Sequence, residues 1–116
     1  SNTVLKDKDP TSHAEVNAIR KACQVLSTHD LTGCELYATG APCPMCLSAI
    51  IWANIKTVYY SGKYEDCQKI GFRDDHIFKF IKEGANDENV VKLELHDNEI
   101  AKSMYNMYAA MSGTIY

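Results

Sequence analysis

Pro42-Cys43-Pro44-Met45-Cys46 is the stretch that decides how the rest of the chain is placed. It follows Cys34 to Ala38, a run rich enough in apolar residues to predict a short buried strand, which ends at Gly40. A second helix is predicted from Pro44 to about Ala53, with the proline in the first turn, where its missing N–H removes no hydrogen bond. Two cysteines placed across such a loop-to-helix junction can bind one metal ion, because the helix N-terminus favours their thiolate forms.

A second motif, His13-Ala14-Glu15, supplies an imidazole and a carboxylate two residues apart. His13 together with Cys43 and Cys46 would give a zinc ion three protein ligands. Tetrahedral zinc with three protein ligands keeps a position open for water, which is the catalytic rather than the structural arrangement. Glu15 can reach that water without being a ligand, so it is the candidate proton carrier.

The remaining segments alternate between helix and strand patterns. Ser1 to Pro10 is polar and predicts a loop, and Ser12 with Glu15 forms a capping-box pattern that begins a helix running to about Leu26. This alternation predicts crossover connections and a mostly parallel sheet with helices packed on it, an α/β fold in a single domain over residues 1–116. The later elements expected are a strand at Thr57–Ser61, helices at Tyr64–Ile70 and Ile77–Lys82 separated by a turn at Gly71–Asp75, a strand at Val90–Leu95, and a final amphipathic helix marked by Ile100, Met104, Met107, Tyr108 and Met111.

Composition sets the outer bounds on function. The chain has 116 residues, of which 46% are hydrophobic, and a net charge of −3 without a cluster of lysine or arginine, which argues against a nucleic-acid substrate. Its 5 cysteines are an odd number, which is typical of a reducing compartment and predicts the cytoplasm. The longest apolar run, Leu47 to Ile55, is too short to span a bilayer, so no membrane role is predicted.

Each motif also has a simpler interpretation. Glu15 alone could be only the capping-box residue of its helix, and Cys43 with Cys46 could be a thiol-disulfide redox pair. A structural zinc site would need a fourth ligand, such as Cys34 or Cys67. Cys23, on the apolar face of the first helix, is expected to be a small core residue. The coincidence of both motifs, in this order, favours the catalytic zinc site.

His-x-Glu followed by Pro-Cys-x-x-Cys is the signature of zinc-dependent base deaminases, and the chain resembles the cytidine deaminase-like superfamily. Within it, the chain is most similar to bacterial guanine deaminases, through Asp9-Pro10-Thr11, the two motifs, Ala49-Ile50, Trp52-Ala53 and Gly71-Phe72. The resemblance implies a three-layer α/β/α fold, a zinc cofactor, and hydrolytic deamination of guanine to xanthine with release of ammonia. A related purine, a purine nucleoside, cytosine and adenosine in transfer RNA stay open as substrates.

The resemblance also implies roles for individual residues. Asn2 would contact the base, Asp74 or else Asp75 would assist substrate binding and proton transfer, and the backbone of Ala14 and Pro42 would line the site. Trp52 either forms a wall of the purine pocket or packs in the core, and Tyr116 would cover the base.

The resemblance has two further implications, for assembly and for the N-terminus. A homodimer would exchange C-terminal segments between its subunits, which is how Tyr116 would reach the base bound by a partner. Members of the family begin with a helix and a strand hairpin that this sequence does not contain. Either that N-terminal part has been cut off or left out, or a partner chain supplies the missing sheet edge.

Overall fold

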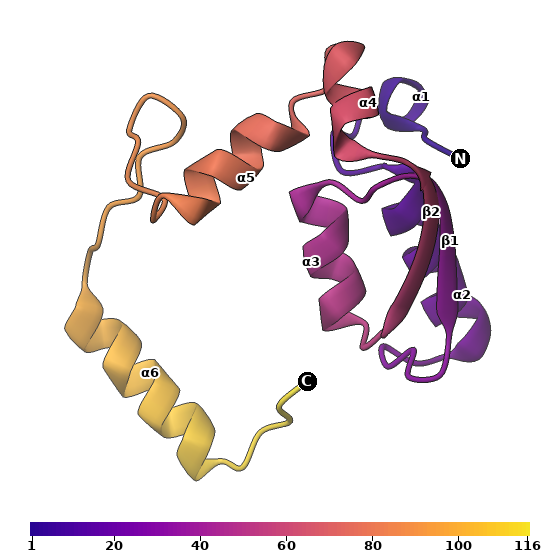
Figure 1. The fold of residues 1–116 in the computed structure, drawn as a ribbon. Coiled ribbons are helices and arrows are strands. Elements are labelled where there is room, and N and C mark those ends of the chain that lie inside the picture. The colour runs from indigo at the N-terminus through magenta and orange to yellow at the C-terminus, as the bar shows by residue number, and fades with distance from the viewer. The chain divides into compact units, whose positions relative to one another are not determined.

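The computed structural model describes residues 1–116, which fall into two compact units, Ser1–Lys79 and Phe80–Tyr116 (Figure 1). Each unit is described separately below. The elements are α1 (Val4–Asp7), α2 (Ala14–Leu26), β1 (Glu35–Gly40), α3 (Pro44–Trp52), β2 (Thr57–Gly62), α4 (Tyr64–Lys69), α5 (Asp74–Lys82) and α6 (Asn98–Ala110).

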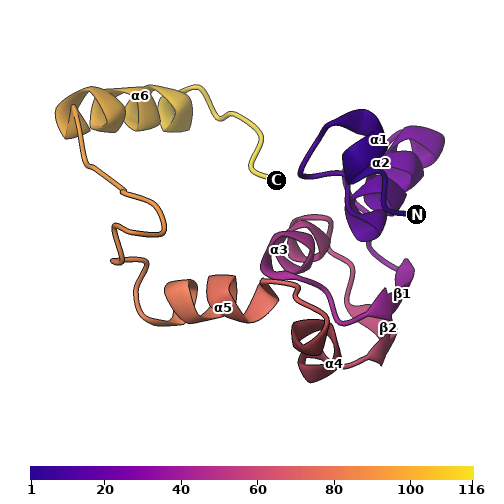
Figure 2. The same ribbon diagram turned by 90° about the horizontal axis from the view of Figure 1, so that it is seen from above.

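The sheet of the first unit consists of β1 and β2, which run parallel. Leu36 pairs with Val58, Tyr37 with Tyr59, and Gly40 with Gly62. Parallel neighbours need a crossover connection, and α3 provides it between the two strands (Figure 2). The predicted α/β fold with a parallel sheet is therefore confirmed.

The core of this unit lies between the sheet and the helices α2 and α3. Leu36 of β1 and Ile50 of α3 are buried, with Ile50 only 2% exposed, and Ile19 and Cys23 of α2 pack against the same cluster. Burying a side chain of this size contributes about 1.5 to 3 kcal/mol. The remaining members of the cluster are Leu31, Ala53 and Ile55, with Ala22, Cys34 and Val58 packed against it.

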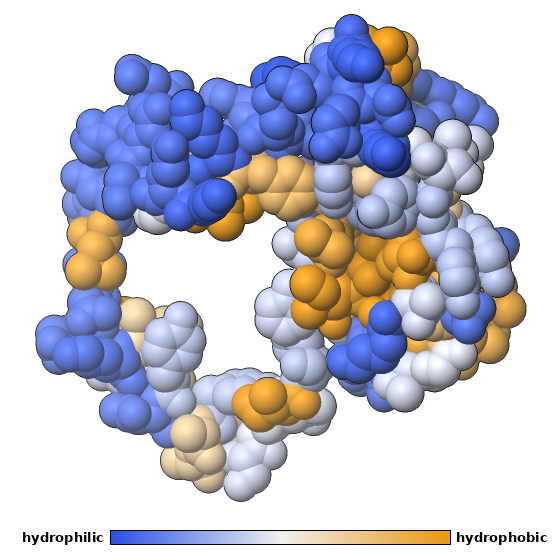
Figure 3. Space-filling model, in the orientation of Figure 1, coloured by the Kyte–Doolittle hydropathy of each residue, from blue (hydrophilic) through white to orange (hydrophobic).

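The two faces of the sheet differ because side chains alternate along a strand. Tyr37 and Tyr59 point to the opposite face from Leu36, where their rings stack with centroids 4.9 Å apart and an interplanar angle of 21°. Both tyrosines are exposed. Hydrophobic surface also gathers over α3, where Ile51 is exposed (Figure 3).

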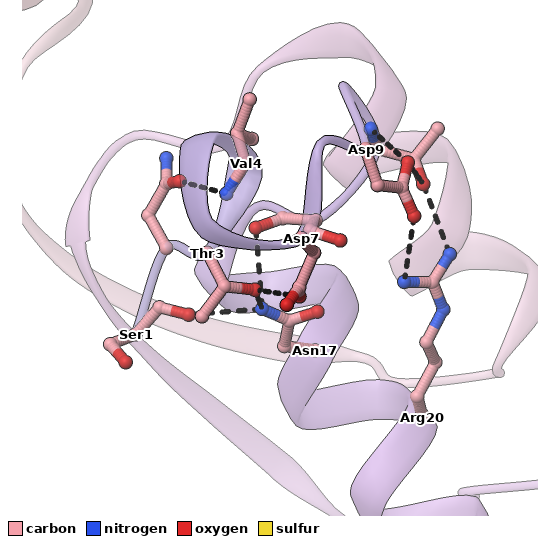
Figure 4. Close-up of polar contacts among 10 residues, drawn as sticks. Ser1, Thr3, Val4, Asp7, Asp9, Asn17 and Arg20 are labelled. Atoms are coloured by element: carbon pink, nitrogen blue, oxygen red, sulfur yellow. Dashed lines mark hydrogen bonds and ion pairs between the residues drawn. The ribbon is translucent and has the colours of Figure 1, made fainter.

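The N-terminal segment contains a short helix, α1, where a loop was predicted. Its attachment to α2 depends on Asn17, whose Nδ2 donates to the carbonyl oxygen of Ser1 at 3.0 Å, the hydroxyl of Thr3 at 2.9 Å and the carbonyl oxygen of Ser12 at 3.2 Å (Figure 4). Asn2 accepts a hydrogen bond from the backbone N–H of Val4. The contacts of Asn17 with Ser1 and Thr3 join residues 16 and 14 positions apart, which is why local patterns did not reveal the helix.

The capping-box prediction is wrong. The helix α2 begins at Ala14 with His13 as its N-cap, and no side chain caps it. Ser12 is buried before the cap, where its carbonyl oxygen accepts from the backbone N–H of Thr3 at 2.9 Å. Glu15 is therefore not tied to a capping role.

Two other boundaries differ from the expectation. The helix α5 begins at Asp74, so the predicted turn at Gly71–Asp75 ends earlier than expected. In the second unit, residues 91–97 form no regular element, and the strand predicted at Val90–Leu95 is absent. A strand needs a neighbour to accept its backbone hydrogen bonds, and this unit contains no other strand.

The second unit ends in α6 and a short tail. The hydroxyl of Tyr108 donates a 2.5 Å hydrogen bond to the carbonyl oxygen of Thr114, which ties the start of the tail to the last turns of the helix. Met104 and Met107 of α6 and Met111, which directly follows the helix, are exposed. None of the helices combines the length and apolar character needed to cross a bilayer.

Candidate metal centre

Three side chains from the N-termini of two helices converge in the first unit. His13 is the N-cap of α2, Cys43 is the N-cap of α3, and Cys46 lies in the first turn of α3. The ligand atoms of these residues all lie within 4.8 Å of one another. Packing of α2 against α3 is what brings the histidine to the cysteines.

The two cysteines have pKa values shifted in opposite directions. The backbone N–H of Cys46 donates to the sulfur of Cys43 at 3.4 Å, and Nδ1 of His13 lies 3.5 Å from the same sulfur. The pKa of Cys43 is lowered from 9.0 to about 6, first by a hydrogen bond from the Cys46 thiol and then by the backbone N–H and His13, against the effect of burial. The pKa of Cys46 is raised, because its thiol donates to Cys43 and because it is buried beside that thiolate and Glu15.

This donor set fits zinc. Bond lengths of about 2.1 Å to nitrogen and 2.3 Å to sulfur place tetrahedral ligand atoms about 3.6 Å apart. The separation of 3.5 Å between Nδ1 of His13 and Sγ of Cys43 agrees with that value. Neither Cys34 nor Cys67 belongs to the cluster, so the fourth ligand that a structural site would need is absent.

Two carboxylic acids lie beside the cluster. Glu15, in the first turn of α2, is half-buried and interacts with the Cys46 thiol. Asp74, at the start of α5, lies close enough to His13 and Glu15 for the charges of both residues to affect its pKa. Burial is the main reason that the pKa of Asp74 is raised, and Glu15 raises it further while His13 opposes the change.

The alternative residue, Asp75, has a different environment. It is exposed, and its carboxylate accepts a 3.1 Å hydrogen bond from Gln68 of α4. Between the two aspartates, Asp74 is the half-buried one whose pKa responds to His13 and Glu15.

The other predicted site residues are placed in different ways. Ala14 lies between His13 and Glu15, and Pro42 is buried directly before Cys43. Asn2 is exposed, with its side-chain oxygen held by Val4. Trp52, at the end of α3, is 65% exposed and is not a core residue, and Tyr116 belongs to the second unit.

Tyr64 is a contact that the sequence analysis missed. Its hydroxyl donates a 2.8 Å hydrogen bond to the carbonyl oxygen of Pro42. Its ring also meets Phe78 of α5 edge-on, with centroids 5.2 Å apart. An aromatic residue at the start of a short helix carries no local signal for such contacts, because both partners are distant in sequence.

Comparison with known proteins agrees with this geometry. Residues 1–62 match the family described as the cytidine and deoxycytidylate deaminase zinc-binding region. The guanine deaminase of Bacillus subtilis (strain 168) is 47% identical over 89 residues, which are 77% of this chain and 57% of that protein. A tRNA-specific adenosine deaminase of Aquifex aeolicus is 50% identical over 61 residues, 53% of this chain and 40% of that protein. The matched part of the chain thus spans little more than half the length of the first relative and less than half that of the second.

Solved structures show the same likeness. The X-ray structure of the Bacillus subtilis guanine deaminase superimposes with a TM-score of 0.82 at 40% identity, covering 93% of this chain and 69% of that one. The guanine deaminase from Nitrosomonas europaea gives a TM-score of 0.61 at 32% identity, covering 64% of this chain and 43% of that one. The expected cytidine deaminase-like fold and zinc cofactor are confirmed, and the chain belongs to the cytidine and deoxycytidylate deaminase zinc-binding family.

Proposed function

We propose that the chain is a zinc-dependent hydrolase that deaminates a purine base, converting guanine to xanthine and ammonia. The observation that carries the proposal is the cluster of His13, Cys43 and Cys46, with two acids beside it, in a chain 47% identical to a guanine deaminase over 77% of its length. A thiol-disulfide redox pair would need neither a histidine within ligand distance of the two sulfurs nor a carboxylic acid beside them. The structure leaves all five cysteines unpaired.

The proposed reaction replaces the exocyclic amine on an amidine-type ring carbon by a carbonyl oxygen from water. Zinc held by His13, Cys43 and Cys46 would supply Lewis-acid activation of that water. Glu15 accepts a proton from the attacking water and gives it to a ring nitrogen. It then assists protonation of the amine, which leaves as ammonia.

Asp74 takes a second role in this proposal. Asp74 is half-buried and electrostatically coupled to His13 and Glu15, and its carboxyl group is proposed to bind the base and to assist proton transfer. Asn2, the backbone of Ala14 and Pro42, and the exposed ring of Trp52 are proposed to contact the substrate. The base would thus be held from several elements of the first unit.

We also propose an assembly and a location for the protein. The exposed apolar side chains of α6 support a homodimer that exchanges C-terminal segments, with Tyr116 over the base in the site of a partner. On this proposal both compact units belong to one deaminase domain. The unpaired cysteines support a place in the cytoplasm, where the enzyme would act in purine metabolism.

A second candidate substrate is adenosine in transfer RNA, because the Aquifex aeolicus relative is a tRNA-specific adenosine deaminase. The net charge of −3 speaks against it, since proteins that grip nucleic acid usually carry a basic surface.

The test is ammonia release by the zinc-loaded protein. The panel comprises guanine, guanosine, adenine, cytosine and a transfer RNA, with the Glu15→Gln variant as the blank. Guanine is expected to be the best substrate by kcat/KM. Turnover of transfer RNA alone would replace the guanine proposal with the second candidate, and no turnover of any member would refute both.

A further inference from the structure

Tyr64 contacts the loop that carries a metal ligand. It is the first residue of α4, and its hydroxyl donates to the carbonyl oxygen of Pro42 at 2.8 Å. Pro42 is buried and directly precedes Cys43, whose sulfur belongs to the cluster. The hydrogen bond therefore fixes the peptide group next to a ligand.

The same side chain contacts the helix that carries Asp74. The ring of Tyr64 meets Phe78 at a centroid distance of 5.2 Å and an interplanar angle of 82°, an edge-to-face arrangement. Phe78 follows Asp74 by four residues in α5, so the two side chains lie on one face of the helix, about one turn apart. Holding Phe78 thus holds the helix end that keeps Asp74 within electrostatic range of His13 and Glu15.

The hydroxyl keeps its proton at neutral pH. Partial burial raises the pKa of Tyr64 above its ordinary value, and the neighbouring Tyr60 and Asp74 raise it further. A phenol that stays protonated remains a hydrogen-bond donor, which is what the carbonyl oxygen of Pro42 requires.

We propose that Tyr64 is a positioning residue that ties the Cys43 loop to the helix carrying Asp74. The hydroxyl fixes the ligand loop, and the ring fixes α5. The part that concerns Asp74 rests on the proposed deaminase function, whereas the part that concerns the ligand loop rests only on the metal cluster.

The ligand-loop part is tested with Tyr64→Phe, which removes the hydroxyl and keeps the ring. The rate at which a chelator removes zinc is expected to rise about 5-fold, the factor that corresponds to one neutral hydrogen bond. The visible spectrum of the cobalt-substituted protein should shift as well, because it reports the geometry of the thiolate ligands. The matched control is Tyr37→Phe, which removes an exposed hydroxyl bonded to Glu35 at 3.3 Å and should leave both measurements at wild-type values.

The α5 part is tested with Phe78→Leu, which leaves the hydroxyl of Tyr64 in place. Turnover, kcat, is expected to fall about 5-fold or more while KM stays within about 2-fold and zinc release stays at the wild-type rate. Faster zinc release in both Tyr64→Phe and Phe78→Leu, together with a lower melting temperature of the zinc-loaded protein, would indicate a general loss of stability and would overturn the positioning role.

Wild-type zinc release and an unshifted cobalt spectrum in Tyr64→Phe would overturn the role of the hydroxyl. Unchanged kcat in Phe78→Leu would overturn the role of the ring. Absence of deaminase activity in the wild-type protein would refute the proposed function, and with it the Asp74 part. The zinc and cobalt measurements would still decide the ligand-loop part.

Discussion

The lowered pKa of Cys43 predicts a measurable thiolate in the zinc-free protein. With a pKa of about 6, Cys43 is about 97% ionised at pH 7.5, whereas a thiol at the ordinary 9.0 is about 3% ionised. Zinc is removed with a chelator, and thiolate absorbance near 240 nm is followed from pH 4.5 to 9 in wild-type protein and in Cys43→Ser. The difference between the two curves should have its midpoint near pH 6.

The cause of the lowered pKa can be tested in the same titration. The hydrogen bond from the Cys46 thiol is the largest cause, so Cys46→Ala should move the pKa of Cys43 upward. Circular dichroism of each zinc-free variant checks that it remains folded. A difference curve without thiolate below pH 8, in folded protein, would refute the arrangement described for the pair.

Four further predictions concern stability, metal and turnover. The free energy of unfolding of the zinc-free protein should rise from about pH 6 to pH 9, because Cys43 binds a proton in the unfolded chain there and does not in the folded chain. Above pH 9 the raised pKa of Cys46 reverses this trend, and urea unfolding that does not change between pH 6 and 9 would contradict the prediction. Cys46→Ala should lose zinc by elemental analysis, whereas Cys23→Ala, outside the cluster, should retain it. Glu15→Gln should keep zinc and lose about 10² to 10⁴-fold in kcat, so near wild-type turnover would rule out its role as proton carrier. Deleting Gly113–Tyr116 should leave zinc in place and weaken guanine turnover, because a closing tail excludes water; unchanged kinetics would show that the tail has no catalytic part.

Local pattern was sufficient for most elements of the first unit. The apolar spacing of α2, the proline at the start of α3 and the β-branched and aromatic content of β2 each predicted an element within a few residues of its observed bounds. These signals are carried by neighbours along the chain. The cluster of His13, Cys43 and Cys46 was equally accessible, because metal ligands require particular residue types at particular spacings.

The errors arose where long-range contacts decide the structure. Ser12 fits a capping pattern, but its carbonyl is held by Thr3 and Asn17, and the helix begins after His13. The run Val90–Leu95 has strand composition and no strand to pair with in its unit. Tyr64 was missed for the same reason, since both of its partners are distant in sequence.

Trp52 gives the protein an optical property that needs no label. It is the single tryptophan of the chain, and it lies on the same helix as Cys46. Trp52 follows Cys46 by six positions, which at about 1.5 Å per residue is a rise of about 9 Å along the helix axis. A metal ion that absorbs in the near ultraviolet would quench indole emission over this distance, so fluorescence of the native chain can report how fast the centre is filled.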